Sequence, residues 1–135
     1  MKFNHIGIFV KTIKEGDNFF KKILKIKKQS DEIEDYKIGV KVKFLYDESN
    51  ICYEIVAPLT KNNPVDGVLN TKKNILNHIA YKTKNFVSDN KKLRSMNCIP
   101  VSKVFKAKAF NDSKIIFYLT SLGYIIELIE EKNEN

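Results

Sequence analysis

The chain repeats part of its own pattern at a fixed spacing, and this repeat limits the fold more than any other feature. Its two histidines stand in similar phrases, Asn4-His5-Ile6-Gly7 and Asn77-His78-Ile79-Ala80, 73 residues apart. The same spacing relates Glu54 to Glu127, each inside an apolar run. Apolar positions follow it without a gap: Ile6 and Ile79, Phe20 and Leu93, Ile26 and Ile99, Val42 and Ile115, Phe44 and Phe117. Such self-similarity predicts two copies of one structural unit.

Each half shows the same order of predicted elements. Alternating, β-branched residues indicate strands, and an apolar stripe with lysines opposite indicates one helix in each half. The first half is predicted to contain strands 3–10, 37–46 and 51–57 and a helix over 15–25. The second half is predicted to contain strands 76–83, 101–105, 114–120 and 124–130 and a helix over 86–97. The second half reads βαβββ and the first half matches it with one strand fewer. The unit is therefore taken as βαβββ, used twice, and the expected fold is α+β, with two βαβββ modules forming a curved mixed sheet.

The same reading divides the chain into four parts. Residues 1–57 form the first module, 58–75 an irregular connector, 76–130 the second module, and 131–135 a polar tail.

Two imidazoles and two carboxylates, supplied pairwise by the two halves, are a ligand set for a divalent metal ion. Neutral imidazole and carboxylate suit Zn, Ni, Co, Fe or Mn, and the chain has no cluster of cysteines for a thiolate site. Residues i and i+2 of a strand share a face, so His5, Glu54, His78 and Glu127 would project from one concave surface if the modules curl together. Four ligands leave two octahedral positions open, which is typical of catalytic sites.

A simpler interpretation is that the histidines are ordinary core residues and that lysines neutralise the glutamates. A buried carboxylate without a partner costs several kcal/mol, so Glu54 and Glu127 each need one. The common spacing of both polar pairs favours the metal site, because duplication alone gives no reason to keep them.

The composition excludes some classes of protein and leaves others open. The net charge is +8, but the lysines are spread along the whole chain and no nucleic-acid-binding motif accompanies them. The apolar runs are far shorter than the roughly 20 residues of a membrane span. Cys52 and Cys98 lie in different halves, so we expect reduced thiols and a cytoplasmic protein, with neither nucleic acid nor membrane as partner.

Four phrases carry a resemblance to the vicinal-oxygen-chelate superfamily, which includes glyoxalase I, methylmalonyl-CoA epimerase, extradiol dioxygenases and bleomycin-resistance proteins. They are HIGIFVKTIKEGDNFFKKIL at 5–24, YEIVAPLTKNNPVDGVL at 53–69, NHIAYKT at 77–83 and IIFYLTSLGYIIELIE at 115–130. The resemblance implies paired βαβββ modules and a divalent metal bound by His5, Glu54, His78 and Glu127. Within the superfamily the chain most resembles the methylmalonyl-CoA epimerases.

That resemblance implies isomerisation through a metal-stabilised enolate, with Glu127 and Glu54 as catalytic carboxylates. The chain departs from these epimerases where Lys37-Ile38-Gly39-Val40 replaces an acidic residue before Gly-Val, and Glu34 or Asp35 could substitute for it if the loop shifts. A glyoxalase I-type (lactoylglutathione lyase) activity is the alternative. Glyoxalase I often has an arginine near its first strand for the glutathione carboxylate, whereas the single arginine here, Arg94, is predicted on a helix.

A second alternative is a non-catalytic binding protein of the resistance type, with an apolar cleft lined by Phe105, Phe110, Phe117 and Tyr118. For an enzyme, the expected partner is an anionic small-molecule substrate, an acyl-CoA or a thiol adduct. A homodimer is also expected, and the site could form within one chain or across two.

Overall fold

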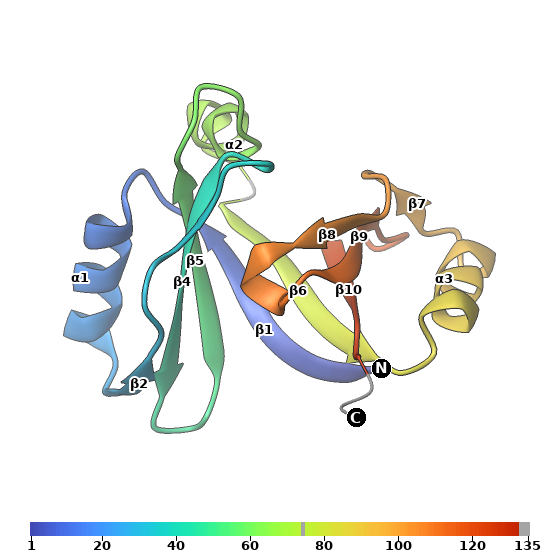
Figure 1. The fold of residues 1–135 in the computed structure, drawn as a ribbon, viewed down its shortest axis with the longest axis horizontal. Helices are drawn as coiled ribbons and strands as arrows, with labels where there is room; N and C mark the ends of the chain where they lie inside the picture. The colour runs from blue at the N-terminus through green and yellow to red at the C-terminus, as the bar shows by residue number, and fades with distance from the viewer. Residues whose placement is uncertain (74, 133–135) are drawn as a thin grey trace. The chain divides into compact units, whose positions relative to one another are not determined.

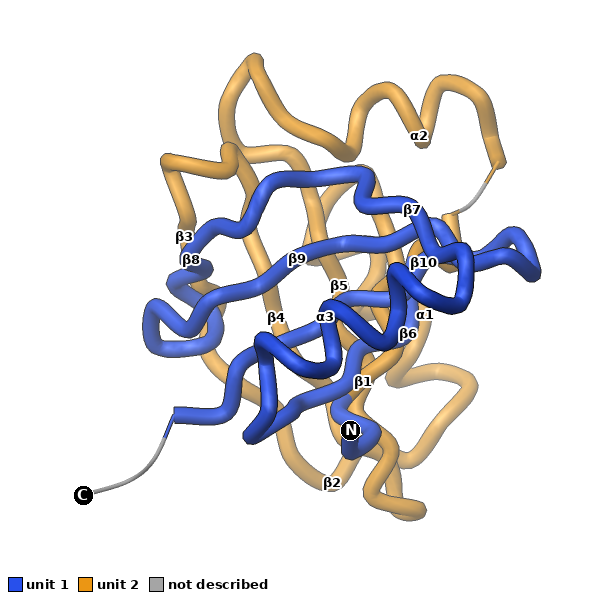
Figure 2. The backbone as a smooth tube through the Cα atoms, turned by 90° about the vertical axis from the view of Figure 1, so that its right-hand side faces the viewer, with its two compact units in different colours: residues 1–4, 78–135 blue, residues 5–77 orange. Residues whose placement is uncertain are grey.

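The computed structural model describes residues 1–73 and 75–132 and divides into two compact units. Unit 1 comprises residues 1–4 and 78–135, and unit 2 comprises residues 5–77 (Figure 2). The first strand, β1 (Lys2–Phe9), contributes its first residues to unit 1 and the rest to unit 2. The last three residues of the predicted tail, 133–135, lie outside the described residues.

Unit 2 is a mixed sheet with one helix on it. Strand β5 (Cys52–Pro58) pairs in parallel with β1 and antiparallel with β4 (Val40–Asp47). Two short strands, β2 (Ile26–Gln29) and β3 (Ile33–Asp35), pair antiparallel with β4. Helix α1 (Ile13–Ile23) lies along this sheet (Figure 1), and a second short helix, α2 (Val65–Thr71), follows β5.

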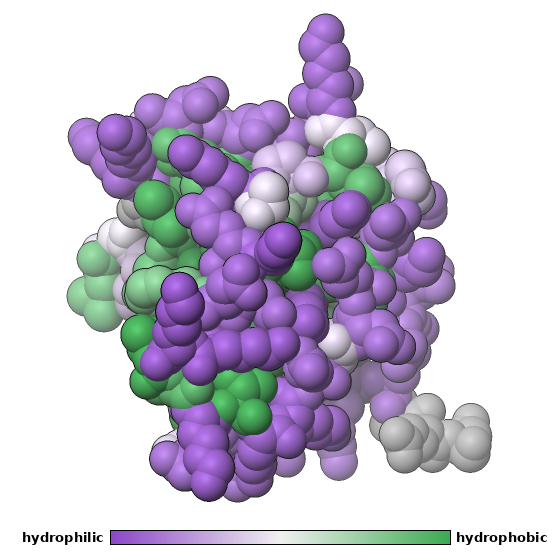
Figure 3. Space-filling view, turned by 90° about the vertical axis from the view of Figure 1, so that its left-hand side faces the viewer, coloured by the Kyte–Doolittle hydropathy of each residue, from purple (hydrophilic) through white to green (hydrophobic). Residues whose placement is uncertain are grey.

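Helix α1 begins two residues earlier than predicted because Thr12 caps it. The Thr12 hydroxyl accepts a hydrogen bond from the Glu15 backbone N–H at 3.1 Å, which satisfies one of the open donors of the first turn. The buried face of α1 joins one apolar cluster with the sheet: Ile13, Phe20, Leu45, Ile55 and Ala57. The outer side of the helix is largely hydrophilic with interspersed apolar side chains (Figure 3).

An ion-pair network joins α1 to β4. Asp17 accepts hydrogen bonds from the Lys21 ammonium at 2.8 Å and from the Lys43 ammonium at 3.2 Å. Burial alone would raise the pKa of the Asp17 carboxyl, but the two ammonium groups outweigh burial and hold this pKa below its ordinary value. The network therefore stabilises the fold while Asp17 is ionised.

Unit 1 has the corresponding arrangement. Strand β10 (Ile125–Glu130) pairs in parallel with β6 (Leu76–Thr83) and antiparallel with β9 (Ser113–Leu119). Strands β7 (Ile99–Pro100) and β8 (Phe105–Ala107) pair antiparallel with β9, and a 3₁₀ turn (Lys108–Phe110) follows β8. Helix α3 (Phe86–Ser95) lies beside the sheet (Figure 1).

The prediction that Tyr118 lines a cleft with Phe117 was wrong, because neighbouring strand residues face opposite ways. Tyr118 is fully buried among core residues, in a cluster with Phe86, Leu93, Cys98, Ile116 and Leu128. Its hydroxyl accepts a hydrogen bond from the Arg94 Nε at 3.2 Å and donates one to the Asn90 side chain.

The α+β fold with βαβββ-type modules is confirmed, but several boundaries move. The predicted strand 37–46 begins at Val40, because the Asp35 side chain accepts from the backbone N–H groups of Lys37 and Ile38 and forms a turn there. Gly39 completes the turn with φ of +82°. The predicted strand 101–105 is instead the two short strands β7 and β8. Strands β2 and β3 were not predicted, and the connector contains α2.

Within the part of the chain that the structure describes, no helix has the length and apolar character needed to cross a bilayer. Cys52 and Cys98 are both buried and free of disulfide bonds.

Candidate metal centre

In unit 2, His5 and Glu54 meet because β1 and β5 run in parallel with a definite register. Gly7 is the register partner of Glu54, so His5, two residues before Gly7, shares the sheet face of the carboxylate. The His5 Nε2 lies 3.5 Å from the Glu54 Oε1. The histidine is 0% exposed and the glutamate 4% exposed, so both polar groups have left water.

Unit 1 contains the same arrangement in equivalent strands. Ala80 on β6 is the register partner of Glu127 on β10, and His78 lies two residues before Ala80. The His78 Nε2 lies 3.6 Å from the Glu127 Oε2. Exposure is 4% for His78 and 2% for Glu127. Two different sequences thus fold into two nearly identical His–Glu pairs.

Two further positions complete each pair; of their four residues, the sequence analysis gave a role only to Phe117, as part of an apolar cleft. The residue opposite each glutamate on the parallel neighbour is small, Gly7 or Ala80, which leaves space for the carboxylate to reach diagonally toward the histidine. The residue opposite on the antiparallel neighbour is Phe44 in one unit and Phe117 in the other. The 73-residue spacing was the signal that could have found both positions.

The phenylalanine rings lie edge-on to the imidazoles. The His5 and Phe44 ring centroids are 5.9 Å apart at 72°, and those of His78 and Phe117 are 5.2 Å apart at 78°. An apolar ring beside each pair lowers the local dielectric and so strengthens interactions between the charged groups and a cation.

The distances within each pair fit ligands of a common ion. A charge-assisted hydrogen bond between imidazole and carboxylate would be about 2.7–2.9 Å long. Two atoms that each bind one ion at about 2.1 Å lie about 3.0–3.4 Å apart, depending on the angle at the ion, and the observed separations are close to the upper end of this range. Within residues 1–73 and 75–132, His5, Glu54, His78 and Glu127 are the group of buried side chains that could hold a metal ion. This set of two histidines and two glutamates indicates a divalent-metal site.

Cys52, the thiol nearest to Glu54 in sequence, is not among the four side chains grouped as possible metal ligands. Burial, opposed in part by a hydrogen bond with Tyr46 and aided by the charge of Glu54, raises the pKa of Cys52 to about 11. Burial and the hydrogen bond with Cys52 likewise raise the pKa of Tyr46 to about 12. Both groups are therefore neutral at pH 7.

The two residues predicted as substitutes for the missing acid have other partners. The Asp35 carboxylate is buried and accepts the backbone hydrogen bonds of the turn before β4. Glu34 accepts a hydrogen bond from the Tyr36 hydroxyl at 2.9 Å, and its side chain is 43% exposed. Both contacts give these carboxylates structural roles in the β3–β4 turn.

Of the predicted cleft aromatics, two stack on the face of unit 1 that carries His78. Phe105 and Phe117 have ring centroids 6.1 Å apart at an interplanar angle of 21°. Phe110 lies in the 3₁₀ turn after β8, and it is partly exposed.

Comparison with known proteins extends over nearly the whole chain. The family model described as "Glyoxalase/Bleomycin resistance protein/Dioxygenase superfamily" matches residues 4–117. The chain is 28% identical over 136 residues to the uncharacterized protein YqjC of Bacillus subtilis, covering 98% of this chain and 94% of that protein.

Solved structures share the fold at low sequence identity. The crystal structure of methylmalonyl-CoA epimerase from Mycobacterium tuberculosis has a TM-score of 0.77 at 20% identity, covering 98% of this chain and 89% of that one. A variant of the Streptomyces coelicolor methylmalonyl-CoA epimerase, in complex with 2-nitronate-propionyl-CoA, has a TM-score of 0.73 at 17% identity, covering 98% and 99%. At this level of identity the likeness establishes the fold.

Proposed function

Because the chain belongs to the glyoxalase/bleomycin resistance protein/dioxygenase superfamily, we propose that it is a metal-dependent isomerase that acts through an enolate of its substrate, in the manner of a methylmalonyl-CoA epimerase. His5, Glu54, His78 and Glu127 would bind a single divalent ion. The substrate would be a small anionic thioester, in keeping with the acyl-CoA ligand bound to a structural relative.

One observation carries this proposal: each unit contains a buried imidazole and a buried carboxylate held at ligand spacing, 3.5 Å in one and 3.6 Å in the other. Burying a carboxylate costs several kcal/mol unless a cation compensates it. A divalent ion would supply that compensation, and the two halves provide its donor set with the same register and the same neighbouring phenylalanine.

When bound, the ion would supply a Lewis acid for the negative charge that develops on the substrate oxygen. Glu127 and Glu54 would hold or move the proton of the substrate carbon, because a carboxylate is the base available in each pair. Rigid strands position both carboxylates, and the rings of Phe44 and Phe117 exclude water beside them. Gly7 and Ala80 keep the space through which each carboxylate reaches its histidine.

Two measurements test the proposal. Elemental analysis of the purified protein should find about one transition-metal ion per chain. Nuclear magnetic resonance in D₂O should show exchange of the α-proton of methylmalonyl-CoA, and this exchange should stop after dialysis against EDTA. Glu127→Gln should abolish exchange, whereas Glu130→Gln, the same chemical change on the other face of β10, should leave it unchanged.

The same assays separate the alternatives. Turnover of the methylglyoxal–glutathione adduct without exchange on the thioester would assign a glyoxalase I-type lyase activity. Purified protein without stoichiometric metal would favour a binding protein, for which the stacked rings of Phe105 and Phe117 offer an apolar surface. Exchange that persists in the metal-free protein would contradict the proposal.

A further inference from the structure

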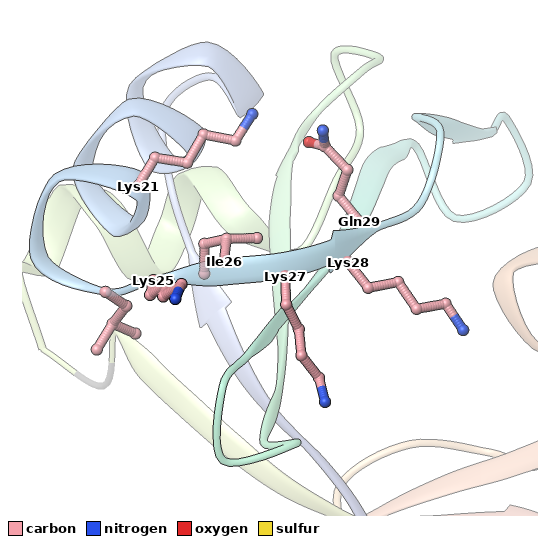
Figure 4. A pocket seen from close by; sticks show the side chains of 7 residues that line it. Lys21, Lys25, Ile26, Lys27, Lys28 and Gln29 are labelled. Atoms are coloured by element: carbon pink, nitrogen blue, oxygen red, sulfur yellow. The ribbon is translucent and has the colours of Figure 1, made fainter.

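Strand β2 contains an irregularity that places two lysines on the same side. Ile26 is the register partner of Asp47 and Lys28 is the partner of Tyr46, so Lys27 is an extra residue in the ladder. A bulge of this kind turns consecutive side chains toward one face instead of alternating them. Figure 4 shows Lys27 and Lys28 extending to one side of β2 and Gln29 to the other.

The register relates these lysines to the face that carries Glu54. The Lys28 ammonium lies 5.3 Å from the centroid of the Tyr46 ring. Tyr46 is in turn the register partner of Cys52, which lies two residues before Glu54 on the same face of β5. Strand geometry puts Lys28 about 7 Å along and about 10 Å across the sheet from Glu54. Because the extended Lys28 side chain covers part of this separation, a ligand a few bonds long can reach from its ammonium group to Glu54.

The charge of the two lysines is not neutralised within the described part of the chain. The ion pairs of unit 2 use Lys21, Lys41 and Lys43, and none of them uses Lys27 or Lys28. Both side chains are exposed. The hollow of about 440 Å³ that they border lies at the edge of the sheet beside α1, with Lys21, Leu24 and Lys25 also in its lining.

We propose that Lys27 and Lys28 bind the anionic part of the substrate, a phosphate or carboxylate group, while its reacting carbon lies beside His5 and Glu54. Because the bulge turns both side chains to one side, both ammonium groups can contact one anion, and the Tyr46 ring orients the ammonium group of Lys28. This inference rests on the proposed function for the identity of the ligand as a substrate, whereas anion binding itself does not depend on a metal.

The test uses the full chain labelled with ¹⁵N, in EDTA and at constant ionic strength, titrated with inorganic phosphate. Amide resonances of β2 and β4 should shift with saturation. In Lys27→Gln/Lys28→Gln the dissociation constant should rise about fivefold or more, which corresponds to the loss of two exposed charge contacts. Lys14→Gln/Lys22→Gln removes the same charge from exposed positions of α1 and should change the constant less than twofold.

A parallel titration with methylmalonate distinguishes the two kinds of anion, because the tighter probe identifies the group for which the lysines are placed. The inference would be overturned if the amide resonances shifted evenly over the whole surface, or if the Lys27→Gln/Lys28→Gln protein had the same dissociation constant for phosphate as the wild type. Metal content of the same variant should remain that of the wild type. A protein that binds phosphate at β2 but holds no metal would therefore refute the proposed function alone.

Discussion

Replacing Glu127 by glutamine should have opposite effects on stability with and without metal. Its side chain is 2% exposed and lies 3.6 Å from the His78 imidazole. Without an ion, the amide avoids the cost of burying a charge while keeping the volume, so the variant should be at least as stable as the wild type. In the presence of the ion, the variant lacks one ligand, so metal binding should stabilise its folded state far less than that of the wild type.

The magnitude follows from linkage. An ion at 100 times its dissociation constant stabilises the folded state by about 2.7 kcal/mol, and one bound 100-fold more weakly stabilises it by only about 0.4 kcal/mol. The unfolding entropy of a 135-residue chain is about 0.28 kcal/mol per kelvin. Metal should therefore raise the Tm of the wild type by about 10 °C and that of Glu127→Gln by about 1–2 °C.

Differential scanning calorimetry in EDTA and in the metal found in the purified protein measures both effects. Glu130→Gln is the matched control on the same strand, and it should retain the full metal-dependent shift. The reasoning fails if Glu127→Gln loses about 5 °C or more in EDTA and yet keeps the wild-type response to metal. In that case Glu127 would stabilise the fold through protein contacts and not through an ion.

Three further predictions concern the scaffold. Asp17→Asn should cost about 1 kcal/mol at pH 7, because it removes a charge-assisted contact with two lysines. Because the folded-state pKa of Asp17 is lowered, this stability is present above its ordinary pKa of 3.8 and is lost as the pH falls through the folded-state pKa. Below about pH 4, the free energy of unfolding of Asp17→Asn, measured by chemical denaturation, should therefore depend less on pH than that of Asp31→Asn. Gly39→Ala should destabilise by about 2–4 kcal/mol, since φ is +82° and a Cβ would lie 2.2 Å from a backbone oxygen. The control Gly67→Ala, in α2 with no atom within 4 Å of its Cβ, should be neutral or stabilising, and equal urea midpoints for the two variants would refute this account. Cys52 should react slowly with iodoacetamide at pH 8, because its pKa of about 11 leaves little thiolate, and rapid labelling in mass spectra of the native protein would contradict that.

The sequence predicted the strands that carry the candidate ligands because their pattern is local. Alternating apolar residues identify a strand and the side chains that share a face, and the common spacing of 73 residues identifies equivalent strands. His5, Glu54, His78 and Glu127 were therefore predicted, and all four are buried. The short strands β2 and β3 were missed, since three or four residues carry too little periodicity to identify an element.

What only the tertiary structure decided is the pairing between strands that are far apart in the chain. The parallel register that sets Gly7 opposite Glu54 and Ala80 opposite Glu127 depends on crossover connections and packing, and no local pattern encodes it. The same holds for the bulge that turns Lys27 and Lys28 to one side, and for the turn that uses the Asp35 carboxylate. Composition and periodicity predict which side chains are buried. The distance between two buried side chains is set by which strands the whole fold brings side by side.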